Sequence, residues 1–147
     1  MRIRPAIVLE ENSNIMLMRY SYSGKDVYQF PGGNTEGIES LEQTLIRELQ
    51  EELNLPVAVH KLLCTAEVIN SQKQQATLHC LFSGAIQNSF SPVINKMETS
   101  ALEVVWMKLS KLDQLNLYPA VGIYIKELFS KKRDDFCHLG VIEQPWF

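Results

Sequence analysis

The chain has 147 residues, 46% of them hydrophobic and 21% charged, a composition typical of one globular domain with its own core. Its formal net charge of −3 excludes the broad basic surface of non-specific nucleic-acid binders, and no apolar run reaches membrane-spanning length. Three widely spaced cysteines favour a reducing compartment over a disulfide framework or a CxxC metal site. We therefore expect a cytoplasmic domain over residues 1–147, with no nucleic-acid or membrane partner.

The apolar pattern predicts strands on both sides of a central helix. Apolar runs indicate strands at Arg2 to Leu9, Ile15 to Tyr20, Val27 to Phe30, Val57 to Ile69, Ala76 to Ile86 and Val104 to Leu109. A second stretch of helical spacing runs from Tyr118 to Lys131, and residues 133–147 carry no assignable pattern. This order of elements predicts an α+β fold in which a mixed sheet lies between helices.

The best-marked helix lies between Ser40 and Asn54. Ser40 is placed as an N-cap, and Gln43 three residues later completes a capping box. Asn54 is expected to end the helix in the left-handed conformation, with Leu55 folding back onto the helix. Apolar residues recur every four positions and predict one buried stripe, with Ile46 beside it: Leu41, Leu45, Leu49 and Leu53.

Three glutamates crowd the end of this helix. Glu48 and Glu52 lie one turn apart without an evident basic partner, and such a like-charge pair costs roughly 0.2–0.5 kcal/mol. Glu51 and Glu52 also occupy the last turn, where the helix dipole disfavours anions by ~0.3–1 kcal/mol. Arg47 can reach Glu51 at four-residue spacing. Because two local rules are broken in one place, the sequence indicates a functional site that lacks a cation.

A hard divalent cation fits this arrangement. Mg²⁺ prefers carboxylate and carbonyl oxygens and keeps several waters of its own. The pair Gly32-Gly33 ahead of the helix leaves backbone groups open to close approach, because no Cβ shields them. An isolated E-x-x-E-E is more often a solvated helix face, but the glycine pair, Glu39 and Arg47 favour a metal site.

The segment also resembles the signature of the Nudix hydrolases, including MutT-like enzymes. That signature is a glycine, five residues, a glutamate, seven residues, and then Arg-Glu-aliphatic-x-Glu-Glu-x-Gly-aliphatic. The matching positions are Gly33, Glu39 and the run Arg47-Glu48-Leu49-Gln50-Glu51-Glu52-Leu53-Asn54-Leu55. Asn54 replaces the second signature glycine, a change that a left-handed helix cap allows. Gly37-Ile38 precedes Glu39, where relatives more often place the glycine directly before the glutamate.

The resemblance implies an α/β/α sandwich that hydrolyses the pyrophosphate bond of a nucleoside diphosphate linked to another moiety. The products would be a nucleoside monophosphate and either a phosphorylated moiety or pyrophosphate. Mg²⁺ is the expected cofactor, with Mn²⁺ as the alternative, held by Glu48, Glu51, Glu52 and the Gly32 carbonyl. Glu48 is also the favoured base for the attacking water, and the sequence does not separate the two roles. Glu39 is expected to position Arg47, and Arg47 to orient Glu51.

Family members often use one further acid from outside the signature. Glu98 and Glu103 both precede the expected strand around Trp106, and each also fits as an ordinary surface glutamate. We favour Glu98 as a metal ligand because it lies within the loop, whereas Glu103 abuts the strand. The histidines lack metal-cluster spacing and are expected to be satisfied structural residues: His60, His79 and His138.

Two other interpretations use the same fold. A Nudix-fold module that binds a nucleotide without cleaving it would typically lack a signature glutamate, and none is missing here. An isomerase-type relative acting on an allylic diphosphate would need further catalytic Cys and Glu residues in a longer chain. The expected partner is a nucleotide-type small molecule: a nucleoside triphosphate, ADP-ribose, a dinucleoside polyphosphate or a nucleotide sugar. The oligomeric state is left open, a homodimer included.

Overall fold

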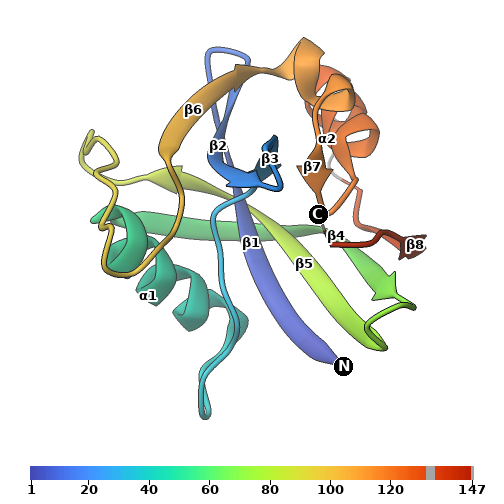
Figure 1. The fold of residues 1–147 in the computed structure, drawn as a ribbon. Helices are drawn as coiled ribbons and strands as arrows, with labels where there is room; N and C mark the ends of the chain where they lie inside the picture. Colours follow the sequence, from blue (N-terminus) through green and yellow to red (C-terminus); the bar gives the residue numbers. More distant parts are fainter. Residues whose placement is uncertain (132–134, 147) are drawn as a thin grey trace.

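The computed structural model describes residues 1–131 and 135–146 and shows a strongly curved mixed sheet with helices packed on it (Figure 1). In chain order the elements are β1 (Arg2–Glu11), β2 (Asn14–Tyr22), β3 (Lys25–Gln29), α1 (Leu41–Leu53), β4 (Val57–Asn70), β5 (Gln75–Ile86), β6 (Glu103–Lys108), the 3₁₀ turn η1 (Leu109–Gln114), β7 (Leu117–Tyr118), α2 (Gly122–Ser130) and β8 (Cys137–Glu143). The strand order is β7-β3-β2-β1-β5-β4-β8, and β6 pairs with β2.

The central strand β1 changes partners along its length, and this change makes room for the glycine loop. It runs parallel to β5 from Arg2 to Leu9, but pairs with β2 only at its last two residues. Along the free edge lies the segment after β3: Ile7 N–H donates to the Pro31 carbonyl (2.8 Å), and Gly33 N–H donates to the Pro5 carbonyl (3.2 Å). The sheet edge therefore fixes the backbone that precedes α1.

The two faces of the sheet carry separate hydrophobic cores. Alternate residues of β1 and β2 point to opposite faces, as the two-residue period of a strand requires. One set packs with the buried leucines of α1: Ile7, Leu9, Met16 and Met18. The other set packs with Ile125 and Leu128 of α2: Ala6, Val8, Ile15 and Leu17. The predicted sandwich of a mixed sheet between helices is confirmed (Figure 1).

Local sequence signals placed α1 correctly. Ser40 and Gln43 form both hydrogen bonds of the capping box, and Asn54 ends the helix at φ 50°, in the left-handed region. Leu55 N–H then donates to the Leu49 carbonyl at 3.2 Å. The predicted strands are found within one or two residues, and the bend expected in β4 appears as register shifts between Val59 and Cys64.

Two details of the expected elements were wrong, and one stretch without a prediction contains a strand. Ile46 is 44% exposed and Thr44 is buried instead, because Ile46 lies on the outer flank of the leucine stripe. Helix α2 begins at Gly122 rather than Tyr118, because the residue before Pro119 favours extended backbone and Tyr118 pairs with Gln29. The unassigned C-terminal stretch contains β8, parallel to β4, while residues 132–134 and 147 lie outside the described part. No helix among the described residues is long and apolar enough to cross a membrane.

Candidate active site

The glycine loop is pressed against β1 and against the helix. A Cβ at Gly32 would collide with the Pro5 carbonyl, and a Cβ at Gly33 would collide with the carboxyl group of Glu48. The guanidinium of Arg4 donates to the Gly32 carbonyl at 3.3 Å. Both positions therefore require glycine, because neighbouring atoms come too close for a Cβ. At Gly33, the missing Cβ leaves the space that the Glu48 carboxyl group occupies.

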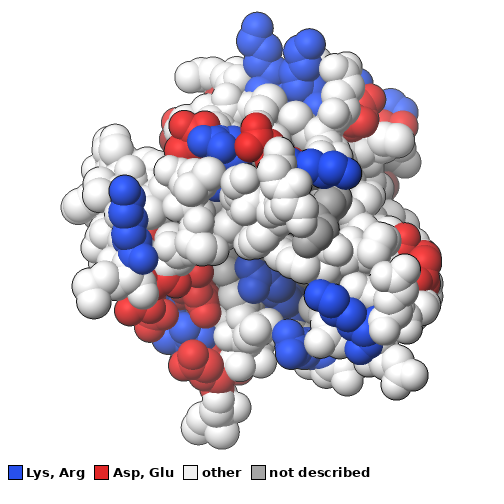
Figure 2. Space-filling model, in the orientation of Figure 1, with Lys and Arg blue, Asp and Glu red and all other residues white. Residues whose placement is uncertain are grey.

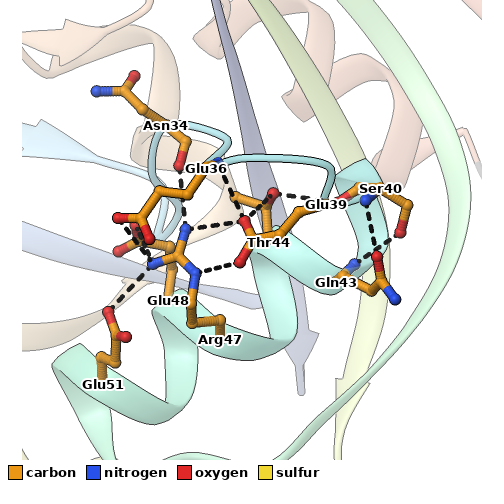
Figure 3. A network of polar contacts seen from close by, with 9 residues as sticks. All are labelled: Asn34, Glu36, Glu39, Ser40, Gln43, Thr44, Arg47, Glu48 and Glu51. Carbon is orange, nitrogen blue, oxygen red and sulfur yellow. Dashed lines mark hydrogen bonds and ion pairs between the residues drawn. The ribbon is translucent and has the colours of Figure 1, made fainter.

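Arg47 is the centre of a network that holds the signature together (Figure 3). Its guanidinium donates to Glu39 (Nε–Oε1, 2.6 Å), to Glu48 (3.0 Å) and to Glu51 (3.1 Å), and it also reaches the Asn34 carbonyl (3.1 Å). Hydrogen bonds from Arg47 hold the pKa of Glu39 down at about 2, and the same bonds raise the pKa of Arg47.

The predicted contacts of Arg47 with Glu39 and Glu51 are present. The expectation that Glu48 lacks a basic partner was wrong, because the broad guanidinium also reaches the residue next to it in sequence. Thr44 also stabilises the network, since its hydroxyl donates to Glu39 Oε2 at 2.9 Å. Glu39 is thus clamped between the helix and the loop, while Arg47 ties both to the glutamates.

Glu48 and Glu52 form a partly buried pair of like charges. Burial raises the pKa of Glu48, although the hydrogen bond from Arg47 works in the opposite direction. Burial and then the charge of Glu48 raise the pKa of Glu52 to about 7. No ion pair or side-chain hydrogen bond to Glu52 is present within the described residues. Glu52 is the carboxylate that most needs a cation from outside the chain.

The loop of residues 88–100 is fastened to the end of α1. Val93 N–H donates to the Leu53 carbonyl and Asn95 N–H to the Glu52 carbonyl, both at 2.8 Å, so that the loop satisfies helix-end carbonyls that lack partners. This docking brings Glu98 close enough for its charge to raise the pKa of Glu52. Glu103 instead binds Arg19 at 2.8 Å on β2.

The donor set suits a hard cation, although it is not a closed cage. Within residues 1–131 and 135–146, no three His, Cys, Asp or Glu side chains are arranged to hold a metal ion together. The nearby oxygens are those of Glu48, Glu52 and the Gly32 carbonyl, with Glu51 engaged by Arg47 and Glu98 in the adjoining loop. An incomplete set of oxygen ligands is what Mg²⁺ uses when it keeps its waters and binds substrate phosphate.

A cavity of about 290 Å³ lies next to the glycine loop, and sequence reasoning did not find it. Figure 2 shows the two charged regions side by side on one face: acidic side chains over α1, and basic side chains over the start of β1 and the β4–β5 turn. The cavity is lined by Arg2, Arg4, Gln29, Asn34, Val68, Asn70, Lys73, Gln75, Thr77, His79, Tyr118 and Trp146. The alternation of Arg2 and Arg4 within a strand was a usable signal, because it puts two cations on one sheet face.

His79 was expected to be a satisfied structural histidine, and that expectation was wrong. The residue is 1% exposed, and neither ring nitrogen has a hydrogen-bond partner among the residues that the structure describes. Burial lowers the pKa of His79 to about 3. In contrast, His138 bonds Thr65 through Nδ1 (2.7 Å) and Glu67 through Nε2 (3.3 Å). Sequence alone gave no sign that these two histidines differ.

Comparisons with known proteins agree with the geometry. Residues 1–128 match the NUDIX domain. The chain is 38% identical over 61 residues to an RNA pyrophosphohydrolase of Teredinibacter turnerae, which covers 42% of this chain and 36% of that protein. It is 34% identical over 68 residues to an 8-oxo-dGTP diphosphatase of Proteus vulgaris, which covers 44% of this chain and 60% of that protein. The chain thus spans less than two thirds of the length of these curated relatives.

Solved structures extend the likeness to the fold. The MutT protein from Methanosarcina mazei has a TM-score of 0.73 at 16% identity, over 90% of this chain and 96% of that one. The E. coli ORF135 protein has a TM-score of 0.71 at 21% identity, over 92% of this chain and 95% of that one. At these identities the similarity concerns the arrangement of the strands and helices alone.

Proposed function

Because the chain belongs to the NUDIX domain family, we propose that it hydrolyses the pyrophosphate bond of a nucleoside diphosphate linked to another moiety, with the help of a divalent cation. The products are a nucleoside monophosphate and either the phosphorylated moiety or pyrophosphate. One observation carries the proposal: a partly buried pair of carboxylates, Glu48 and Glu52, is held beside the glycine loop and next to a basic cavity. The names of the curated relatives, RNA pyrophosphohydrolase and 8-oxo-dGTP diphosphatase, support the bond type.

Mg²⁺ is the proposed cofactor, with Mn²⁺ as the alternative. Glu48, Glu52 and the Gly32 carbonyl would hold it, with Glu51 and Glu98 as further ligands. When bound, the ion supplies positive charge that offsets the charge developing on the attacked phosphate. The raised pKa of Glu52 supports this assignment, because a carboxyl group that is costly to ionise alone gains most from a cation.

Four further roles in the reaction fall to side chains of the protein itself. Glu48 accepts the proton of the attacking water, and burial favours this role because it raises the pKa of the carboxyl group. Arg47 orients Glu48 and Glu51 through bonds of 3.0 and 3.1 Å, and Glu39 fixes Arg47. Arg4 binds a substrate phosphate, because its guanidinium already lies at the Gly32 carbonyl and faces the cavity.

We further propose that residues 1–147 act as one domain in the cytoplasm. Strand β8 pairs with β4 in the same sheet, so the C-terminal segment belongs to the domain rather than following it. Cys64, Cys80 and Cys137 are free thiols, as a reducing compartment would keep them. A homodimer stays a prediction that light scattering of the purified protein would check.

A panel of nucleoside diphosphate derivatives, incubated with the protein with and without Mg²⁺, tests the reaction. Products are separated by chromatography, and Glu52→Gln is run beside the wild type. Metal-dependent release of a nucleoside monophosphate by the wild type, and its loss in the variant, is the expected result. Binding of panel members without any cleavage would replace the proposal with a nucleotide-binding module.

A further inference from the structure

The cavity is floored by one face of the sheet, and that face changes character along the strands. Arg2 and Arg4 of β1 lie on the same face as Ala6, which is four residues after Arg2 and two after Arg4, and the neighbouring strand β5 follows the same pattern. Ala6 and Leu81 belong to the core under α2, whereas Thr77 and His79 line the cavity. On this one face, the side chains of β1 and β5 therefore belong to the core at one end of the strands and line the cavity at the other.

His79 is the feature of this floor that the fold itself does not explain. Its ring is buried, and both nitrogens lack a partner in the described structure, although buried polar groups are nearly always hydrogen-bonded. The ring meets Tyr118 edge to face, with centroids 5.4 Å apart. Because burial keeps the imidazole neutral at physiological pH, it offers one donor and one acceptor.

Aromatic rings from β7 and from the C-terminal end line the cavity beside this position. Trp146 packs edge to face on Tyr118 at 4.9 Å and on Tyr22 at 4.8 Å. Gln144 fixes the segment, since its side chain donates to the Leu117 carbonyl and accepts from Ala120 N–H, both at 3.0 Å. A flat ring that enters the cavity therefore meets aromatic neighbours and an imidazole with unused hydrogen-bonding capacity.

The charges of the lining define the rest of the ligand. Three cations line the cavity, Arg2, Arg4 and Lys73, and none of them forms an ion pair within the described residues. No acidic side chain is among the lining residues. Gln29 also lines the cavity, and its side-chain amide forms no hydrogen bond within the described residues. A ligand with an uncharged polar ring and an attached polyanion fits this lining, and a cationic ligand does not.

We propose that His79 is a specificity-determining residue: its imidazole hydrogen-bonds the nucleobase of the substrate, in a cavity lined by Tyr118 and Trp146. Arg4 binds the adjoining phosphate, and the remaining phosphate groups extend along Gly32 to Glu48 and Glu52. This inference rests on the proposed hydrolysis and names the part of the substrate that the cavity selects. It assigns base selection to β5, which lies outside the Gly33 to Leu55 segment.

Nitrogen-15 NMR of the histidine rings in the wild-type protein tests the contact directly, without metal and without turnover. Adenosine, guanosine, cytidine and uridine monophosphates are titrated separately, and His79→Phe identifies the His79 signals. We expect at least one monophosphate to shift the His79 ring nitrogens while the exposed His60 stays unchanged. Binding of monophosphates that never moves the His79 signals would overturn the proposal, as would a failure of all four to bind.

Kinetics provide the second test. For His79→Phe, which keeps an aromatic ring but has no ring nitrogen, the ratio of kcat/KM between preferred and disfavoured bases should fall about tenfold, mainly through KM. His60→Phe is the matched control and should keep the wild-type ratio. Unchanged base preference in His79→Phe would overturn the proposal. A monophosphate-induced His79 shift in a protein that cleaves nothing would count against the hydrolysis alone, so the two failures are distinguishable.

Discussion

Replacing Glu52 with glutamine tests whether the carboxylate pair is a site that awaits a cation. In the folded chain, burial and the charge of Glu48 raise the pKa of Glu52 from 4.5 to about 7. A folded-state pKa above the unfolded value means that the stability contributed by the protonated group is full below pH 4.5 and is lost as the pH rises through about 7. At ~1.36 kcal/mol per pKa unit, this change corresponds to roughly 3 kcal/mol.

Urea unfolding of the metal-free protein measures the effect. At about pH 8 the Glu52→Gln variant should be more stable than the wild type by roughly 1–3 kcal/mol, and the gain should disappear below pH 4.5, where Glu52 is protonated in both the folded and the unfolded chain. Glu51→Gln is the control, because Glu51 is exposed and bound to Arg47, and it should show no such gain. Saturating Mg²⁺ should stabilise the wild type more than Glu52→Gln.

The hydrolysis rate of the same variant tests the metal-ligand role of Glu52. Glu52→Gln should lose hydrolysis by orders of magnitude while it gains stability, a combination that a merely damaged fold does not produce. A variant that is no more stable at alkaline pH would refute the deduction from burial and like charge. A variant that is stabilised but hydrolyses at the wild-type rate would refute the metal-ligand assignment instead.

Three further substitutions separate packing, helix ending and site geometry. Leu49→Ala should destabilise the protein by ~2–5 kcal/mol in urea unfolding, because Leu49 is 1% exposed in the core under α1. An unchanged urea midpoint would mean that Leu49 is not buried there. Asn54→Ala and Asn54→Gly both lose the hydrogen bond from Asn54 Nδ2 to the Val93 carbonyl, but alanine tolerates φ 50° poorly and should be ~1 kcal/mol less stable than glycine; equal stabilities of the two variants would contradict the left-handed cap. Gly33→Ala should displace the Glu48 carboxyl group and abolish most hydrolysis, with far-UV circular dichroism unchanged; full activity would rule out the close contact.

What the sequence predicted well is what short segments determine. The ends of α1 follow from Ser40, Gln43 and Asn54, each of which acts on backbone within a few positions. The strands follow from their apolar runs, and the family follows from residues that span one loop and one helix. Of the three glutamates that Arg47 hydrogen-bonds, two were also predicted, and the third, Glu48, was missed because helix neighbours one apart normally face different directions.

What the sequence did not reveal depends on pairing between distant segments. Strand β8 has no distinctive local pattern and is recognisable only through its parallel pairing with β4. The cavity draws its lining from β1, β3, β4, β5, β7 and the C-terminal segment, so no single window contains it. The sequence around His79 is that of an ordinary strand. That its ring nitrogens lack hydrogen-bond partners in the described structure becomes visible only when distant residues such as Tyr118 are packed against the ring.

Two groups that lack a partner among the described residues, the carboxylate of Glu52 and the imidazole of His79, lie at opposite ends of one path. Arg4 connects them, because it pairs in register with His79, donates to the Gly32 carbonyl and lowers the pKa of both groups through its charge. On β1, Arg4 lies opposite His79 and Ala6 bridges to Gly32, so the two ends are only two residues apart, roughly 7 Å at ~3.3 Å per residue. A ligand that satisfies both groups therefore joins a pyrophosphate, which carries a cation to Glu52, to a ring that can hydrogen-bond the imidazole of His79.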